Sequence, residues 1–185
     1  DNKPLIMSIA AGSKIKDIES WLGGKLNVVR VMPNQPALID QGISALVSNE
    51  KTSHKNRLLA EKVMSSVGHA VWLNDESQMD AVTAVSGTGP SYFYLLIDTM
   101  INVAIELGID PKIARTLALE TARGATALAA TEKESMSSLI ERVKSPGGTT
   151  EAAFKYLDNM DARRIFSEAI LKAAERSTEL SKTND

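Results

Sequence analysis

Apolar and polar positions follow two different patterns along the chain, and the change comes near residue 75. Before it, short apolar runs alternate with two amphipathic segments; the runs lie at residues 5–10, 28–32, 43–48 and 70–73, and the segments at 14–22 and 54–66. This alternation is typical of strands and helices in an α/β domain. Afterwards the periodicity is helical throughout and predicts helices at residues 76–85, 91–107, 111–130, 136–143, 151–159 and 162–180. We expect an α/β domain at residues 1–74 and an all-α domain at residues 75–185.

The first apolar run, Leu5-Ile6-Met7-Ser8-Ile9, is typical of a strand that is buried on both faces. Such a strand needs neighbours on both sides, yet the run lies almost at the start of the chain. The chain also lacks an initiating methionine. We therefore expect it to be the later portion of a longer polypeptide.

The segment at residues 91–107 has almost no polar face. Its polar residues include Asp98, Asn102 and Glu106, which recur every four residues along its middle and disfavour a membrane span. The next predicted helix is rich in alanine, which permits close helix contacts. A helical domain of this size can hardly bury both segments alone, so we expect an intimate homo-oligomer.

The composition excludes several kinds of partner and of functional site. The 185 residues carry a net charge of -2 without a basic run, so neither nucleic acid nor an anionic membrane is an expected partner. The absence of cysteine excludes disulfides, thiolate metal sites and a cysteine nucleophile, and His54 and His69 are too few for a histidine metal site. We expect no bound metal. No signal peptide is visible, which predicts a cytoplasmic protein.

The stretch Ser145-Pro146-Gly147-Gly148-Thr149-Thr150 carries few side chains and leads into a predicted helix. Glycines let a ligand approach the backbone, and the first turn of a helix offers unpaired N–H groups to an anion. The stretch therefore suits a carboxylate or a phosphate. The alternative is a glycine-rich connector whose threonines cap the helix.

A second glycine-rich stretch, Ser86-Gly87-Thr88-Gly89-Pro90, superficially suggests a dinucleotide fingerprint. The third glycine of that fingerprint would fall at Tyr92, and a helical pattern precedes the stretch where the fingerprint needs a strand. We interpret it as the start of a helix, with Pro90 at the first helical position and glycines that allow close helix packing.

Four ordered blocks together resemble pyrroline-5-carboxylate reductase. They are Ser8-Ile9-Ala10-Ala11-Gly12, Arg30-Val31-Met32-Pro33-Asn34-Gln35-Pro36, the block at residues 81–90, and the block at residues 145–150. The resemblance covers essentially the whole chain. It implies the later half of a Rossmann-like sheet, followed by a helical domain that makes an interlocked dimer; assemblies of dimers also occur in the family.

The resemblance further implies an oxidoreductase of proline biosynthesis that reduces 1-pyrroline-5-carboxylate to L-proline with NADPH or NADH. The front of the dinucleotide domain is missing, and at about 30 residues per βαβ unit this is roughly 80 to 90 residues. We therefore expect the 185-residue chain alone to be inactive.

The family's substrate site maps onto the block at residues 145–150. The resemblance implies that the N–H groups of Gly147, Gly148, Thr149 and Thr150 hold the substrate carboxylate, with Ser145 in the same substrate-binding turn. It also implies that the Thr150 hydroxyl is the donor to the imine nitrogen. A threonine hydroxyl is a poor acid, so its expected catalytic role is to orient and polarise.

The cofactor side of the site maps onto two strand ends. Ile9, Ala10 and Ala11 would end the first strand and line the nicotinamide ring, and Asn34 and Pro36 would lie in the second nicotinamide-side loop. Strand-end packing is the alternative role for the first group, and a purely structural loop is the alternative for the second.

One departure from the family and two alternative interpretations remain. The family carries a glutamate closely followed by a proline before the glycine turn, whereas this chain has Glu132 and Glu134 without a proline, so their role is open. A β-hydroxyacid dehydrogenase is set aside because Phe93 occupies the position of the catalytic lysine. A truncated, non-catalytic oligomerisation module that cannot bind a dinucleotide is the other alternative.

Overall fold

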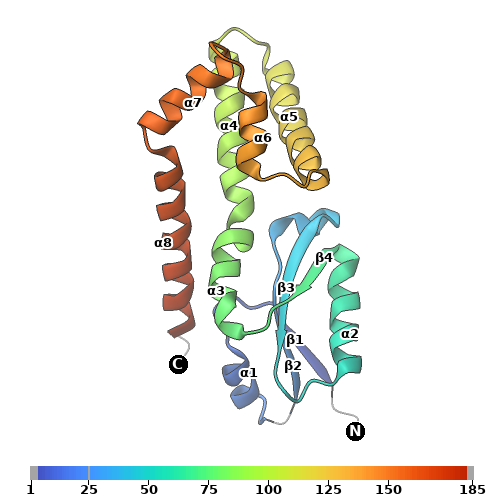
Figure 1. The fold of residues 1–185 in the computed structure, drawn as a ribbon. Helices are drawn as coiled ribbons and strands as arrows, with labels where there is room; N and C mark the ends of the chain where they lie inside the picture. Colours follow the sequence, from blue (N-terminus) through green and yellow to red (C-terminus); the bar gives the residue numbers. More distant parts are fainter. Residues whose placement is uncertain (1–3, 25, 183–185) are drawn as a thin grey trace. The chain divides into compact units, whose positions relative to one another are not determined.

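The computed structural model describes residues 4–24 and 26–182, which fall into two compact units (Figure 1). The sheet unit holds the described residues up to Pro90 and from Glu168 onward, and the helical unit is Ser91–Ser167. The helical unit thus interrupts the sheet unit along the sequence. The last strand ends at Trp72, where the strand pattern ends in the sequence. The assignment of separate roles to residues 1–74 and 75–185 stays a prediction.

Four strands of the described chain form one mixed sheet in the order β1-β2-β3-β4. They are β1 (Leu5–Ser8), β2 (Asn27–Met32), β3 (Gly42–Ser48) and β4 (Gly68–Trp72). β1 pairs parallel with β2 and β3 parallel with β4, whereas β2 and β3 are antiparallel. The helices α1 (Ile15–Trp21) and α2 (His54–Met64) provide the two parallel crossovers. The connection at residues 33–41 is too short for a crossover, so β3 must reverse direction.

Each face of the sheet has its own apolar core. On one face α1 and α3 (Met79–Val82) contribute to a cluster of Ile15, Ile18, Val28, Val47 and Met79. On the other face α2 covers a cluster of Val29, Val31, Leu46, Ala60 and Met64. β2 and β3 are therefore buried on both sides, as a continuous apolar run predicts.

β1 differs from the expectation that it is buried on both faces. All four of its residues are only half-buried, because among the described residues β1 has a neighbour on one edge only. The apolar run predicted a strand correctly, and the second neighbour that it was expected to need is not among the described residues.

The segment between β4 and α4 (Gly89–Glu106) is helical but irregular. It passes through a 3₁₀ turn at Glu76–Gln78, then α3, then a π-helical turn at Thr83–Gly87. The chain therefore stays helical where the sequence predicted a break, and Pro90 is the second residue of α4 instead of the first. An added Cβ on Gly87 would lie 2.5 Å from Met32 Cε of β2, and one on Gly89 would meet no heavy atom within 4 Å, so the close helix packing expected at these glycines is not seen among the described residues.

The C-terminal half of α8 (Ala162–Lys182) packs on the sheet unit through hydroxyl groups. Ser177 Oγ donates to one carboxylate oxygen of Asp80 at 2.6 Å, and Thr178 Oγ1 donates to the other at 2.9 Å. Ser177 and Ser181 are buried. The Asp80 carboxylate thus joins α3 to the C-terminal half of α8.

The helical unit contains most of α4 together with α5 (Pro111–Thr131), α6 (Met136–Val143) and α7 (Thr149–Asn159). These helices begin and end within about two residues of the predicted bounds, because local caps define them. Asp110 Oδ1, for example, accepts hydrogen bonds from the backbone of Lys112 and Ile113, directly before Pro111 at the first helical position.

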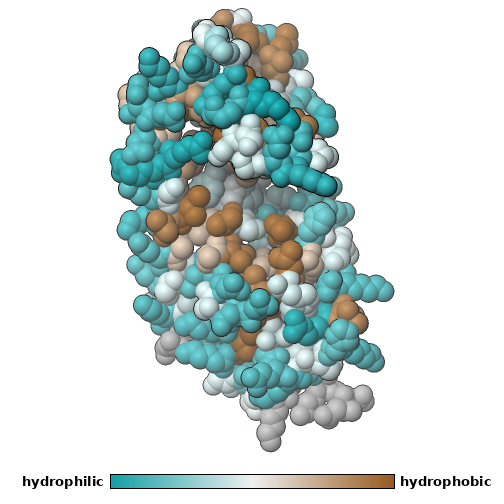
Figure 2. Space-filling model, viewed as in Figure 1, coloured by the Kyte–Doolittle hydropathy of each residue, from teal (hydrophilic) through white to brown (hydrophobic). Residues whose placement is uncertain are grey.

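The apolar helix α4 is not covered in the single chain, which agrees with the expectation that a helical domain of this size cannot bury it alone. Its large side chains remain exposed, as do many apolar side chains of the other helices; on α4 and just beyond it they are Phe93, Tyr94, Leu95, Leu96, Met100, Val103, Ile105 and Leu107. Figure 2 shows apolar patches on one face of the molecule. Exposure on this scale is typical of a protein–protein interface.

A membrane span was disfavoured by the polar residues of this segment. Within the part of the chain that the structure describes, no helix has both the length and the apolarity to cross a bilayer. The cytoplasmic location expected from the sequence stays a prediction.

Candidate functional site

The glycine-rich stretch forms a tight turn at residues 145–148. The Gly148 N–H donates to the Ser145 carbonyl at 2.9 Å, and Gly147 adopts a φ of 70°. Pro146 at the second position and a positive φ at the third are the signature of a type II turn. A Cβ on Gly148 would lie 2.3 Å from Ser145 Oγ. Both glycines are therefore required, one for its backbone conformation and the other for space.

The turn leads directly into α7, but neither threonine caps it. The capping position belongs to Gly148, and Thr149 and Thr150 are the first two residues of the helix. The interpretation of the threonines as caps is therefore wrong. Within the described residues neither threonine hydroxyl has a hydrogen-bond partner, and Thr150 is half-buried. Its hydroxyl remains available to a ligand.

The N–H groups of the turn divide into two kinds. Gly148 uses its N–H inside the turn, and the Gly147 N–H donates to the carboxylate Oε2 of Glu151 at 2.5 Å. The first backbone bond of α7 runs from Ala152 to Gly148, so the N–H groups of Thr149 and Thr150 have no backbone acceptor among the described residues. Two of the four expected donors are thus open.

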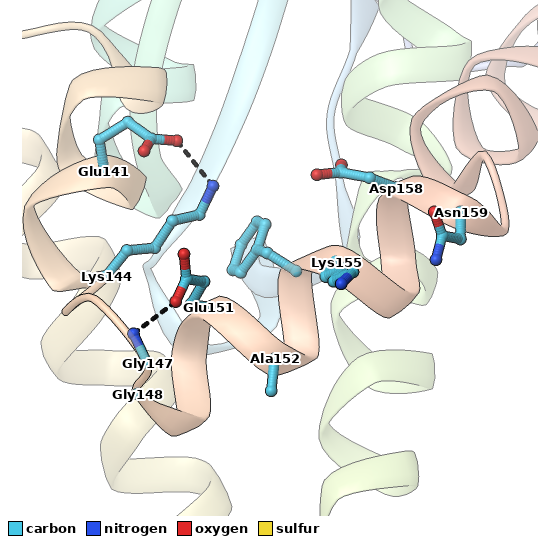
Figure 3. A pocket seen from close by; sticks show the side chains of 10 residues that line it. Glu141, Lys144, Gly147, Gly148, Glu151, Ala152, Lys155, Asp158 and Asn159 are labelled. Carbon is cyan, nitrogen blue, oxygen red and sulfur yellow. Dashed lines mark hydrogen bonds and ion pairs between the residues drawn. The ribbon is translucent and has the colours of Figure 1, made fainter.

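A charged hollow of about 600 Å³ adjoins the turn (Figure 3). Lys144 crosses it: its ammonium lies 2.7 Å from Glu141 Oε1 and 4.6 Å from the centre of the Phe154 ring. Lys155, Asp158 and Asn159 continue its lining along α7, together with Gly147, Gly148, Glu151 and Ala152. Thr150 is not part of this lining.

Glu132 and Glu134, whose role was open, both face Arg142 of α6. Arg142 lies 2.7 Å from a carboxylate oxygen of Glu132 and 3.7 Å from one of Glu134. The hydrogen bond that Arg142 donates to Glu132, and then the charge of Glu132, raise the pKa of the Arg142 guanidinium above its ordinary value. The two glutamates therefore link the loop before α6 to α6 itself.

The two loops expected on the cofactor side leave the sheet at the same edge, because β1 and β2 are parallel neighbours. β1 ends at Ser8, so Ile9, Ala10 and Ala11 follow the strand instead of ending it, and Ile9 is exposed. The Asn34 side chain accepts a hydrogen bond from the Ile43 N–H at 3.0 Å, which ties its loop to β3.

Pro36 lies in the first turn of the 3₁₀ helix Gln35–Ile39 that follows Asn34. A structural role is thus visible for this loop. Nicotinamide binding by the two loops stays a prediction. In the described ranges, no three His, Cys, Asp or Glu side chains gather as metal ligands would.

The bond between Glu151 and Gly147 and the position of Lys144 over Phe154 were not expected from the sequence. The sequence did contain a signal for the bond between Glu151 and Gly147. Counting from the capping residue Gly148, Glu151 is the third residue of the helix, a position from which a carboxylate commonly reaches back to backbone N–H groups. The second depends on side-chain directions that sequence spacing does not define.

A Rossmann-like half sheet followed by helices is shared with solved reductases: one from Coxiella burnetii superposes with a TM-score of 0.89 at 37% identity, covering 96% of this chain and 66% of that one. The Plasmodium falciparum enzyme, solved with NADP bound, gives a TM-score of 0.91 at 28% identity, covering 96% and 67%. The expected fold class is confirmed.

The family described as pyrroline-5-carboxylate reductase dimerisation matches residues 76–180. The chain belongs to the pyrroline-5-carboxylate reductase family, which confirms the resemblance drawn from the four sequence blocks. The reductase of Pseudomonas aeruginosa is 45% identical over 95% of this chain, and that of Haemophilus influenzae 37% identical over 95%. The chain spans 64% and 65% of the length of these two relatives.

Proposed function

We propose that the chain supplies the substrate end and the dimerisation region of a pyrroline-5-carboxylate reductase, which reduces 1-pyrroline-5-carboxylate to L-proline. The observation that carries this proposal is the turn at residues 145–148, which leads into two open N–H groups and an unpaired, half-buried hydroxyl at the start of α7. The family match supports the choice of substrate.

The chemistry requires little from the side chains. The nicotinamide, when bound, supplies the hydride that reduces the C=N carbon, and one proton completes the ring nitrogen of proline. The N–H groups of Thr149 and Thr150 hold the substrate carboxylate, and the Thr150 hydroxyl orients the imine nitrogen. The N–H group of Gly147 joins them when Glu151 releases it, whereas Gly148 and Ser145 set the turn, since the Gly148 N–H is already used inside it.

The cofactor of the proposed reaction is NADPH or NADH. Ile9, Ala10 and Ala11, with Asn34 and Pro36, provide the nicotinamide side, since both loops leave the same edge of the sheet. Residues 1–74 form the later part of the dinucleotide-binding domain, and residues 75–185 the helical dimerisation and substrate-binding domain. The Plasmodium falciparum structure with NADP bound supports this assignment of the cofactor.

The chain acts as a homodimer, and dimers assemble further in some members of the family. The exposed apolar side chains of α4 support this, as does the match to a dimerisation family. Size-exclusion chromatography with light scattering is expected to give a dimer or a larger species. A stable monomer would contradict the proposal.

A non-catalytic oligomerisation module remains the competing function, because no complete dinucleotide fingerprint occurs in the sequence. We expect no tight binding of NADPH to the 185-residue chain in a fluorescence titration and no turnover. Joining the chain to the part of the Pseudomonas aeruginosa reductase that it does not cover is expected to restore turnover. A folded, dimeric chimera that binds NADPH and does not reduce the substrate would favour the module.

Thr150 is tested in the same active chimera. Thr150→Val removes the hydroxyl at nearly constant volume and is expected to reduce kcat by about two to three orders of magnitude, the size of one lost catalytic hydrogen-bond donor. Thr150→Ser keeps the hydroxyl and is expected to restore most of the rate. Equal rates for both variants would remove Thr150 from the catalytic machinery.

A further inference from the structure

Glu151 occupies part of the turn that the proposed function assigns to the substrate. The capping residue of α7 is Gly148, which has no side chain to accept a hydrogen bond. Glu151 lies one turn into the helix and reaches back, so that its carboxylate accepts from the Gly147 N–H at 2.5 Å (Figure 3). A hydrogen bond to a charged group is stronger than one between neutral groups. The chain thus places one of its own carboxylates against the turn.

A second possible partner for the Glu151 carboxylate lies on the same helix. Lys155 follows Glu151 by four residues, the spacing and order at which a glutamate and a lysine attract each other best on a helix surface. In the described part of the chain Lys155 has no ion pair, because Glu151 is turned towards Gly147 instead. The other lysine of the hollow, Lys144, is already held by Glu141.

We propose that Glu151 is an internal competitor of the substrate carboxylate at the glycine turn, and that Lys155 receives Glu151 when the substrate binds. The proposal rests on the proposed function, since it concerns the regulation of that same site. A ligand must then displace the Glu151 carboxylate from the turn with its own carboxylate. The turn favours ligands that carry a carboxylate, and it binds them more weakly than an unoccupied turn would.

The direction in which ligand affinity changes when Glu151 is removed distinguishes competition with the ligand from a purely structural role. If Glu151 only stabilises the start of α7, its removal loosens the turn and weakens ligand binding. If Glu151 competes with the ligand, its removal strengthens binding, by about fivefold for one exposed hydrogen bond. Without Lys155, the Glu151 carboxylate has no alternative partner to the Gly147 N–H. Removal of Lys155 is therefore expected to weaken ligand binding by a few-fold.

The test is a titration of the ¹⁵N-labelled chain with L-proline, followed at the backbone amides of Gly147 and Thr149 by NMR. Glu151→Gln is expected to lower the Kd about fivefold, and Lys155→Gln is expected to raise it. Asp158→Asn is the matched control, because it removes one negative charge from the same hollow without a contact to the turn. Its Kd is expected to stay within about twofold of wild type.

The outcomes distinguish failure of the Glu151 competition from failure of the proposed substrate site. Binding that is unchanged or weakened in Glu151→Gln overturns the competition, and so does an equal gain in Asp158→Asn, which would assign the effect to net charge. If no variant binds L-proline, the proposed function itself fails at this turn. The amide shift of Gly147 in Glu151→Ala without ligand reports the internal bond directly, and an unchanged shift overturns the inference independently of any ligand.

Discussion

The strain that the turn would impose on any other residue gives a quantitative test of its geometry. Gly147 has a φ of 70°, and a Cβ added there would meet no heavy atom within 4 Å. Gly147→Ala therefore adds no clash and isolates the cost of the left-handed backbone. This cost is about 1–2 kcal/mol for an L-residue, partly offset by about 0.4–1 kcal/mol from the stiffer unfolded chain.

We therefore expect Gly147→Ala to lower the free energy of unfolding by about 1 kcal/mol, which corresponds to a fall in Tm of about 2–4 °C in a chain of this size. Gly147→Asn is the control, because asparagine visits the left-handed region more readily than alanine and should lose less. The measurement is urea and thermal unfolding followed by circular dichroism. If alanine and asparagine cost the same, or if alanine costs nothing, the assignment of strain to this position is wrong.

Three further predictions concern the sheet unit. Ser44 is buried with a hydroxyl that has no partner among the described groups, so Ser44→Ala should be neutral or should stabilise the fold by up to about 1 kcal/mol in urea unfolding; a clear loss would reveal a hidden partner. Asp80→Ala leaves the buried Ser177 hydroxyl without its acceptor and should cost about 1–3 kcal/mol by the same assay, whereas no loss would show that the Asp80 contacts do not stabilise the packing of α8. The hydrogen bond from Lys51 lowers the pKa of Glu19 below 4.5, so its stabilisation is present above about pH 4.5 and is lost as the pH falls through the lower folded value. Unfolding at several pH values should show this acid-side loss in wild type and a smaller one in Glu19→Gln.

Local rules were enough to predict most of the helices and the turn. The bounds of α5 follow from Asp110 and Pro111, and α6 begins after Ser135, whose Oγ accepts from the Ser138 N–H. The type II geometry follows from a proline followed by two glycines. In each case the residues that determine the helix bound or the turn type are close in sequence, so the pattern of residue types is enough to predict it.

Features that depend on distant groups were not predicted. The reversed direction of β3 follows from the short connection at residues 33–41, but only once the sheet order is known. The bond between Glu151 and Gly147 depends on which way one side chain turns, since the spacing to Lys155 favours the opposite choice equally well. The sequence therefore predicted where the glycine-rich turn lies, and the structure was needed to show which of its N–H donors are open.

The hydroxyl contacts of Asp80 have a consequence for the order in which the chain is completed during synthesis. They join residues that are 97 and 98 positions apart, with the whole helical unit between them. At about 5–20 residues per second, the ribosome needs roughly 5–20 seconds to travel from the codon of Asp80 to those of its partners. The sheet unit, although it starts first, is therefore finished last, and a nascent chain that stops at Ser167 lacks the segment that closes it.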